Sequence, residues 1–362
     1  MSQDTTGAAA PEPVFRAGAA TAPDAPHTGT PGGLTRRGAV AALLAAPALV
    51  RQAAAQGSGG GRAAWPADRP VRVIVPLAAG GTSDFLARSI GARLQEVTGQ
   101  NFVVENRTGG GGAVGWQAAA RAPADGTTVT VCDNALPLAV ALNRDLGFDP
   151  KTELEPVTML AEYAPILMVN PSLPVRDLKE FVAYAKERPG QLFYGSNGVG
   201  GVPHMQTELL QDVAGIRMNH VSYRGMAQAA TDLVAGQVHL VIAVIPTILG
   251  QMRGGTLRAI AVGTDGARVA AAPDVPSARE QGIDFTSTSW FGMMAPRGTP
   301  PEMAGRMRSA VAAALDNADL RRRLDESGGV PVGGTPEALR QSIDSEITLW
   351  TRLVREKNIK LE

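Results

Sequence analysis

The chain has 362 residues, of which 44% are hydrophobic and 19% charged, a balance that excludes a wholly disordered protein. Its length exceeds the ~250–300 residues at which single hydrophobic cores stop growing and predicts two domains or one large one. The 34 basic and 34 acidic residues give a net charge of zero, without the basic excess of a nucleic-acid-binding protein. The single cysteine, Cys132, excludes disulfide scaffolds and Cys-based metal sites, and with only four histidines we expect no metal site and no cofactor.

The first 61 residues are predicted to be a disordered extension, an export signal and a linker. Residues 1–33 are rich in Ala, Pro, Gly and Thr and show no apolar periodicity. The pair Arg36-Arg37 then precedes an apolar run at 39–50, too short for the ~20 residues that span a bilayer. This pattern is typical of a twin-arginine export signal cleaved near Ala55, which predicts a periplasmic protein. Export by the general secretory route and an Ala-rich linker with a chance Arg pair remain alternatives.

Strands and helices then alternate in the order typical of a doubly wound α/β fold. The β-branched run in residues 70–76 predicts a buried strand, and a helix with Thr82 or Ser83 as its N-cap follows it. Further strands are expected at 102–105, 127–132, 166–169, 192–195, 218–221, 238–245 and 257–262. Further helices are expected at 113–121, 178–187, 203–214, 227–235, 301–317, 318–327 and 336–356. We expect the chain to cross between two lobes near residues 165 and 288. The first lobe would comprise 62–164 and 288–362, and the second 165–287.

Three segments share one design: residues 76–84, 195–201 and 223–228 each join a strand end to a helix start through glycine. A helix N-terminus presents unpaired N–H groups and a partial positive charge, so anions bind there without Arg or Lys. In open α/β sheets such loops lie at the ligand crevice. Three of them facing one cleft would bind a carboxylate, with hydroxyls of Thr82, Ser83 and Ser196 assisting. Taken singly, each glycine can also simply provide a turn with positive φ.

Several side chains near these loops allow two interpretations. Asp84 repels anions, so we expect it to cap the helix or to meet an amine. For His204, which follows Pro203 at a helix start, we favour a structural role over ligand contact. His220 and His239 are expected to pack, whereas Tyr223 and Trp290 either line the cleft or belong to the core.

Signatures of catalysis are missing from the sequence. It contains no Gly-x-Ser-x-Gly elbow, no P-loop lysine and no His-Glu-x-x-His motif. An export signal, two α/β lobes and anion-binding loops without catalytic groups predict a solute-binding protein. The alternatives are a receptor that presents its ligand to a sensor kinase and an exported α/β enzyme that uses Ser196 or His204.

Short motifs follow one another in a specific order from Trp65 to the C-terminus. They include Trp65-Pro66, Gly80-Gly81-Thr82-Ser83-Asp84, Glu105-Asn106-Arg107, Asp125-Gly126-Thr127, Tyr194-Gly195-Ser196, Tyr223-Arg224-Gly225, Gly236-Gln237-Val238 and Gly298-Thr299-Pro300. In this order and spacing the chain resembles the periplasmic solute receptors of tripartite tricarboxylate transporters, the Bug family.

The resemblance implies a two-lobed Venus-flytrap fold, similar to type II periplasmic binding proteins, in which each lobe is a mostly parallel sheet flanked by helices. It implies a monomer that binds a small organic carboxylate and delivers it to the membrane permease subunits of a tripartite tricarboxylate-type transporter. Neither enzymatic activity nor a nucleic-acid partner is expected. Our candidate ligand contacts are Leu77, Ala78, Ala79, Gly81, Thr82, Ser83, Asp84, Ser196, Asn197, Gly200, His204, Tyr223, Gly225, Met226, Ala227, Gln228 and Ala243.

The chain also departs from the pattern of that family. Ala79 and Thr108 stand where the family usually has Pro, and Met226 stands where it often does. His239 and Ala243 stand where the family usually has Asp. Ala243 is near the end of its strand, so the cleft would lack a polar contact there. This weakens the case for an amino-acid ligand, and a tricarboxylate is not implied either.

Overall fold

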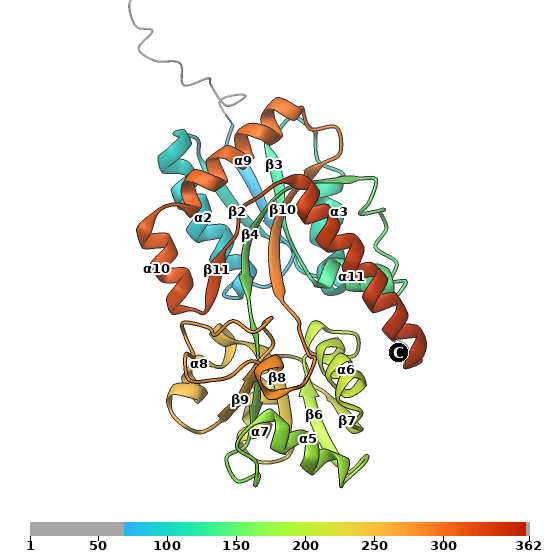
Figure 1. Cartoon of the computed structure of the whole chain (residues 1–362). Coiled ribbons are helices and arrows are strands. Elements are labelled where there is room, and N and C mark those ends of the chain that lie inside the picture. The colour runs from blue at the N-terminus through green and yellow to red at the C-terminus, as the bar shows by residue number, and fades with distance from the viewer. Residues whose placement is uncertain (1–68, 360–362) are drawn as a thin grey trace, which may run out of the picture. The chain divides into compact units, whose positions relative to one another are not determined.

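The computed structural model describes residues 69–359, and the predicted export segment lies outside them. Within this range the strands form two sheets (Figure 1). The six-stranded sheet, in the order β11-β4-β10-β3-β1-β2, contains β1 (Val71–Val75), β2 (Phe102–Asn106), β3 (Thr128–Asp133), β4 (Leu154–Tyr163), β10 (Ser289–Pro296) and β11 (Gly329–Pro331). The five-stranded sheet, in the order β7-β6-β8-β5-β9, contains β5 (Pro165–Val169), β6 (Leu192–Ser196), β7 (Met218–Ser222), β8 (Leu240–Val244) and β9 (Arg258–Val262). We call the parts built on these sheets the first and the second lobe.

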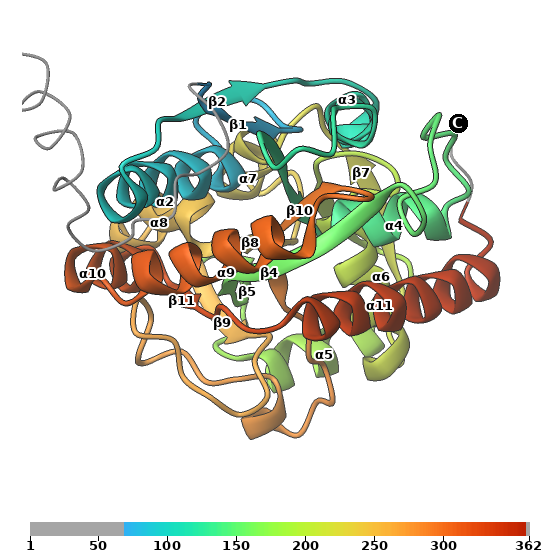
Figure 2. The same ribbon diagram turned by 90° about the horizontal axis from the view of Figure 1, so that it is seen from above.

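Helices cover both faces of each sheet. In the first lobe α2 (Thr82–Thr98), α9 (Pro301–Leu315) and α10 (Ala318–Glu326) cover one face, whereas α3 (Ala113–Ala120), α4 (Ala135–Ala141) and α11 (Pro336–Glu356) cover the other. In the second lobe α5 (Leu178–Lys186) and α6 (Val202–Ala214) cover one face, and α7 (Met226–Val234) and α8 (Ile245–Arg253) the other. This arrangement is the predicted two-lobed α/β fold, and Figure 2 shows α9 and α11 running past β4.

The two faces follow from the period-2 alternation of side chains along a strand. In β1, Val73 and Val75 point into the cluster beneath α2 and α9, whereas Ile74 between them joins the cluster beneath α3 and α11. In β10, Met293 and Met294 divide in the same way. Both faces of each sheet are therefore apolar, which is why the strands read as nearly continuous hydrophobic runs.

The sheets are more mixed than predicted. β1 pairs in parallel with β2 and β3, and β6 pairs in parallel with β7 and β8. In contrast, β10 runs antiparallel to β3 and β4, and β5 runs antiparallel to β8 and β9. The reason lies in the lobe connections: β4 leads the chain out of the first sheet and β10 brings it back, so one of the two must oppose its neighbours. Only Ala164 separates the end of β4 from the start of β5.

The C-terminal helix packs on both lobes. Trp350 and Leu353 near the end of α11, together with Leu138 of α4, belong to the same apolar cluster as β5, β6, α5 and α6 of the second lobe. Lys357 Nζ lies 2.9 Å from Asp212 Oδ1 of α6. Residues 288–362 were predicted to belong to the first lobe, and contacts between α11 and the second lobe were not predicted. These contacts join the two lobes.

Several elements were not predicted or were placed differently. The N-cap of α2 is Gly81, in an extended conformation, and Thr82 is already helical, so Thr82 and Ser83 are not N-caps. The strand predicted at 238–245 ends at Val244, because Ile245-Pro246 begins α8 with Pro in its first turn. The α-helices and strands that were not predicted are α4, α8, β4, β10 and β11. β4 and β10 were missed because both are buried on both faces and lack an alternating pattern. Among the described residues no helix combines the length and apolar character needed to cross a membrane.

We expect Gly115→Ala to destabilise the first lobe at the start of the first glycine loop. A Cβ at Gly115 would lie 2.6 Å from Pro76 Cα and 2.8 Å from the Arg107 carbonyl oxygen, so α3 and β1 would have to separate. Overpacking of this kind costs about 1–3 kcal/mol in the free energy of unfolding, measured by urea denaturation.

The matched control is Gly305→Ala in α9, where a Cβ would meet no atom within 4 Å. This change should stabilise the protein slightly, because Ala favours a helix interior by about 1 kcal/mol over Gly. Equal free energies of unfolding for the two variants would contradict the close approach at Gly115.

Candidate functional site

The first glycine loop is held in place by Asp84. Gly80 has a φ of +84°, and its N–H donates to Asp84 Oδ2 at 3.0 Å. Asn106 Nδ2 donates to Asp84 Oδ1 at 3.0 Å and to the Leu77 carbonyl oxygen at 3.1 Å. Residues 78–81 are exposed, so this network presents their backbone to solvent rather than burying it.

The Asp84 carboxylate faces its own lobe. Hydrogen bonds from Arg88 are the main cause that lowers the pKa of Asp84 to about 2, against the opposing effect of burial. The Arg88 guanidinium also donates to Asn106 Oδ1 at 3.0 Å. Asp84 is therefore ionised and paired, and its role here is to shape the loop. The neighbouring Ser83 hydroxyl points elsewhere and donates to Asp133 Oδ2 at 3.4 Å.

The second loop is organised by groups that were themselves candidate contacts. Ser196 is 0% exposed, and its Oγ donates to the Gly198 carbonyl oxygen at 3.0 Å and lies 2.7 Å from His220 Nε2. The Gly200 N–H donates to His204 Nδ1 at 2.9 Å. Ser196, Gly200 and His204 thus shape the loop through bonds within the second lobe, whereas the side chain of Asn197 is exposed at a cavity.

Three aromatic rings support this loop from below. The His204 and His220 rings stack with centroids 4.1 Å apart, and Tyr194 stacks on both. Burial lowers the pKa of His204 to about 4 and also lowers that of His220, so both rings are neutral near pH 7. In the close pair of Ser196 and His220 the Ser196 side chain is fully buried and His220 is half-buried.

The third loop is tied to the second. The Tyr223 N–H donates to the Ser196 carbonyl oxygen at 3.0 Å, and the Tyr223 hydroxyl donates to Asp232 Oδ2 at 2.8 Å. Gln228 Oε1 accepts from the Arg224 N–H at 3.2 Å, which turns this side chain back onto the loop. Gly225 is extended and precedes Met226, the first residue of α7. Met226 is the candidate of this loop that lines a cavity.

Two cavities meet at Thr247 and receive residues from both lobes. The smaller, of about 200 Å³, is lined by Asp133, Asn134, Asn197, Val202, Pro203, Gln206, Met226, Ala243, Val244, Thr247, Ser289 and Phe291. The larger, of about 410 Å³, is lined by Gly80, Gly81, Thr82, Phe85, Pro246, Thr247 and Ser327. We treat the two as one cleft.

The cleft brings together part of the candidate set. Gly81 and Thr82 reach it from the first lobe, and Asn197, Met226 and Ala243 from the second. The other candidates, all within the described chain, lie outside both linings: Leu77, Ala78, Ala79, Ser83, Asp84, Ser196, Gly200, His204, Tyr223, Gly225, Ala227 and Gln228. For these residues direct ligand contact remains a prediction.

Asp133 is the most informative residue that the sequence reasoning missed. It ends β3 next to β1, is 8% exposed and lines the smaller cavity. Its Oδ1 accepts from the Ala135 N–H at 3.0 Å, and burial raises its pKa to about 6. A signal for it was available, because a carboxylate directly after the predicted strand at 127–132 stands at the carboxyl end of a strand, where ligands bind.

Asn134 lines the smaller cavity beside Asp133 and is held in place by Glu346. Asn134 Nδ2 donates to the Thr288 carbonyl oxygen at 2.9 Å and to Glu346 Oε1 at 2.6 Å, and its Oδ1 accepts from the Trp290 N–H. Burial raises the pKa of Glu346 to about 7, although the indole N–H groups of Trp290 and Trp350 both donate to its carboxylate. Trp290 is thus a buried core residue outside both cavity linings, anchored to α11 through Glu346.

A bond between the lobes lies beside the second loop. Arg144, which follows α4 in the first lobe, donates through Nη2 to the carbonyl oxygens of Gly200 at 3.2 Å and Val199 at 3.4 Å. Desolvation of this half-buried guanidinium lowers its pKa without removing its charge. Arg144 therefore connects the first lobe to the carbonyl side of the second loop.

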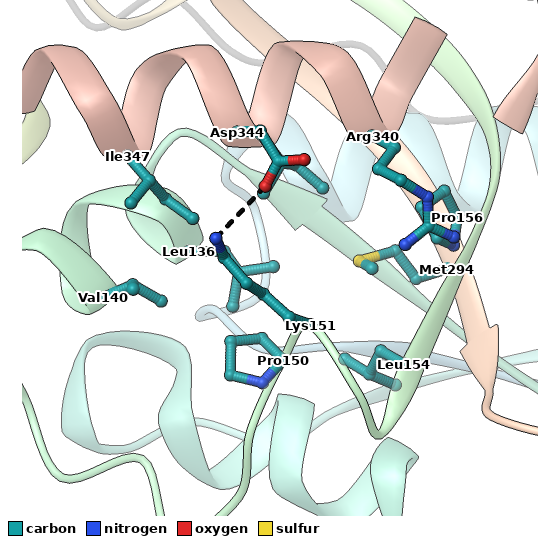
Figure 3. A pocket seen from close by; sticks show the side chains of 11 residues that line it. Leu136, Val140, Pro150, Lys151, Leu154, Pro156, Met294, Arg340, Asp344 and Ile347 are labelled. Atoms are coloured by element: carbon teal, nitrogen blue, oxygen red, sulfur yellow. Dashed lines mark ion pairs between the residues drawn. The ribbon is translucent and has the colours of Figure 1, made fainter. Parts of the chain in front are cut away.

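Another cavity, of about 210 Å³, lies within the first lobe between α4, β4, β10 and α11 (Figure 3). Apolar side chains form most of its lining, and Lys151 pairs with Asp344 across it at 3.3 Å. None of the candidate contacts lines it. In the described part of the chain no group of three or more His, Cys, Asp or Glu side chains could hold a metal ion.

Two α/β lobes joined by crossing strands around a shared cleft define the class of solute-binding receptors of the Venus-flytrap type. Residues 86–359 match the family described as "Tripartite tricarboxylate transporter family receptor". The chain belongs to this family, which confirms the resemblance carried by its motifs.

Relatives of known sequence and structure agree with this assignment. Protein BugT of Bordetella pertussis is 35% identical over 297 residues, which cover 81% of this chain and 91% of BugT. The solved structure of R. palustris Rpa4515 with adipate is 36% identical, with a TM-score of 0.72 and coverage of 82% of this chain and 99% of that one. MatC (Rpa3494) from Rhodopseudomonas palustris with bound malate is 33% identical, with a TM-score of 0.69 and coverage of 79% and 99%.

We expect Asp84→Asn to destabilise the protein by about 1–2 kcal/mol at pH 7, because the charged hydrogen bonds to Arg88 are lost. The pKa of Asp84 is lowered in the folded state, so this stabilisation is present above the ordinary carboxyl value of 3.8 and is lost as the pH falls toward about 2. Urea denaturation of both proteins at pH 7, 4 and 3 should show the difference shrinking.

The control is Asp316→Asn, which removes the carboxylate of an exposed pair with Arg321. Exposed pairs contribute little, so this variant should follow the wild type at every pH. A difference for Asp84→Asn that stays constant down to pH 3 would contradict an ionised, paired Asp84.

Proposed function

We propose that this receptor captures a small organic carboxylate in its interlobe cleft and delivers it to the membrane permease subunits of a tripartite tricarboxylate-type transporter. The proposed location is the periplasm, reached through the export signal predicted before Ala55. Membership of the receptor family supports the transport role, and relatives crystallised with adipate and malate support the carboxylate. We propose a binding role without catalysis, consistent with the buried Ser196 hydroxyl.

One observation carries the proposal: four helix starts line the cleft. Thr82 is the first residue of α2, Val202 of α6 and Met226 of α7, and Val244 is the N-cap of α8. Each of these helices has at least nine residues, and the N-terminal end of each carries a partial positive charge of about half a unit. Lysine and arginine are absent from the described residues that line the cleft. Backbone amides and helix dipoles are therefore the groups available to bind an anion.

Capture follows from the division of these helix starts between the lobes. The first lobe supplies α2, and the second supplies α6, α7 and α8. A ligand held by both lobes stabilises the arrangement in which both contact it, which drives closure about the crossing strands. Exclusion of water on closure strengthens each dipole contact, because the local dielectric constant falls.

The proposal is tested by Gly81→Leu. Gly81 is extended and exposed, and a Cβ there would lie 3.6 Å from the Ala78 carbonyl oxygen, so the fold should tolerate a side chain. A Leu side chain would nevertheless fill the approach to the start of α2. We expect the affinity for carboxylates, found first by native mass spectrometry and then measured by calorimetry, to fall at least tenfold, about 1.4 kcal/mol.

Gly305→Leu is the matched control, because it adds the same side chain to an open position in α9 away from the cleft. Its carboxylate affinity should equal that of the wild type. Unchanged affinity in Gly81→Leu would refute the first loop as part of the binding site.

Uptake of the identified ligand by cells that lack this protein tests delivery, and undiminished uptake would refute the transport role.

We expect Arg144→Ala to speed ligand dissociation about fivefold. The change removes hydrogen bonds that join the first lobe to Val199 and Gly200, and one such bond contributes about 1 kcal/mol. Stopped-flow measurement of the dissociation rate checks this. Arg121→Ala removes a guanidinium that donates to the Gly147 carbonyl oxygen within the first lobe, and its rate should not change. Equal rates in both variants would exclude a role for Arg144 in closure.

A further inference from the structure

A single carboxylate dominates the electrostatics of the cleft. Among the described residues that line the two cavities, Asp133 is the only one with a charged side chain. The remaining lining consists of apolar side chains, backbone and neutral polar groups such as Asn197, Gln206 and Thr247. An anionic ligand therefore meets helix starts on several sides and one negative charge at the end of β3.

Asp133 retains unused capacity to accept hydrogen bonds. A carboxylate has about four acceptor positions. The Ala135 N–H occupies one on Oδ1 at 3.0 Å, and the Ser83 hydroxyl approaches Oδ2 at 3.4 Å. Within residues 69–359 no Lys, Arg or His nitrogen lies within 4.0 Å of this carboxylate. A side chain that is more than nine-tenths buried at a cavity wall is thus left without a cation.

Buried carboxylates are normally paired or they become protonated, because desolvation penalises an isolated charge. A ligand with two carboxylates would add electrostatic repulsion, since its second carboxylate would approach Asp133 with no cation to screen the two negative charges. A positively charged group on the ligand would resolve it by providing both the missing charge and the missing donors.

We propose that Asp133 binds an ammonium group of the ligand, so that the substrate class is small amino-carboxylates. This inference rests on the proposed carboxylate-binding function and specifies it further. The carboxylate of the ligand lies against the helix starts, and its ammonium group donates to Asp133. Ala243, one of the two positions at which the family usually has Asp, lines the same cavity without a charge, and in this chain Asp133 of the first lobe supplies the acidic group there.

The pH dependence of binding separates this arrangement from its alternative. An ammonium group binds the ionised form of Asp133, so protonation competes with the ligand and affinity falls as the pH drops through about 6. A dicarboxylate would instead bind best to protonated Asp133, and its affinity would rise over the same range. The other titratable groups beside Asp133 are Glu346 on α11 and the thiol of Cys132, and the pKa values of both are raised. Both are therefore predominantly uncharged below pH 6, where the two ligand classes diverge.

The test is calorimetry of the full mature protein with matched sets of probes. Each set keeps one chain length and varies one end: an amino acid, the corresponding hydroxy acid, the simple monocarboxylic acid and the dicarboxylic acid. We expect the tightest probe to carry an amine and to lose at least tenfold affinity, about 1.4 kcal/mol, in Asp133→Asn. The Asn Oδ1 can still accept from the Ala135 N–H, so thermal stability should change little. The affinity for dicarboxylates should stay the same or rise.

Glu162→Gln is the control variant, because it neutralises a half-buried carboxylate of β4 that lies outside both cavity linings, and it should keep the preference for amines. The inference is overturned if a hydroxy acid or a dicarboxylate binds more tightly than its amine counterpart, or if Asp133→Asn leaves amine affinity unchanged. Should Asp133→Asn fold poorly, the pH profile of the wild type decides by its sign. Dicarboxylate binding that Gly81→Leu abolishes would refute this inference alone, whereas no carboxylate binding in any set would refute the proposed function as well.

Discussion

The convergence of four helix starts on one cleft, whose described lining contains no Lys or Arg, constrains much of this structure. The first turn of a helix leaves N–H groups unpaired, and α2, α6, α7 and α8 all begin at the cleft. Such groups are effective only if the backbone around them is held open, since a relaxed loop would turn its amides to solvent or to itself. Side chains that hydrogen-bond to the loops from within each lobe meet this requirement. Asp84, Asn106 and Arg88 hold the first loop, and Ser196 with the stacked histidines holds the second.

Many of the motif residues that this chain shares with the receptor family fix the conformation of the loops. Gly80-Gly81-Thr82-Ser83-Asp84 reads at first as a set of ligand contacts. In the structure its glycines supply the accessible backbone, and Asp84 supplies the acceptor that fixes the conformation of Gly80. Tyr194-Gly195-Ser196 and Tyr223 play the same part in the second lobe, where the Tyr223 N–H joins two loops through the Ser196 carbonyl oxygen. Polar side chains in such motifs thus serve the loops as much as the ligand.

Several separate connections join the two lobes. β4 continues into β5 after one residue, the chain returns through β10, and the end of α11 packs on α6. Arg144 adds hydrogen bonds at the second loop. Asn134, beside Asp133 in the cavity lining, is tied through Trp290 and Glu346 to the buried core under α11.

The sequence by itself determined the order of strands and helices, the two-lobed class, the family, and the three loops at the carboxyl ends of β1, β6 and β7. Those features depend on local patterns: β-branched runs, helical spacing, and glycine between a strand and a helix. Only the tertiary structure decided which polar groups are engaged within the lobes and which face the cleft. Ser196 pairs with His220, 24 residues away, and Asp84 with Asn106, 22 residues away. Asp133, which the sequence reasoning passed over, stands at the cleft because β3 lies beside β1. Hydrogen-bond partners this far apart in the chain are set by strand order and helix packing, which no local pattern records.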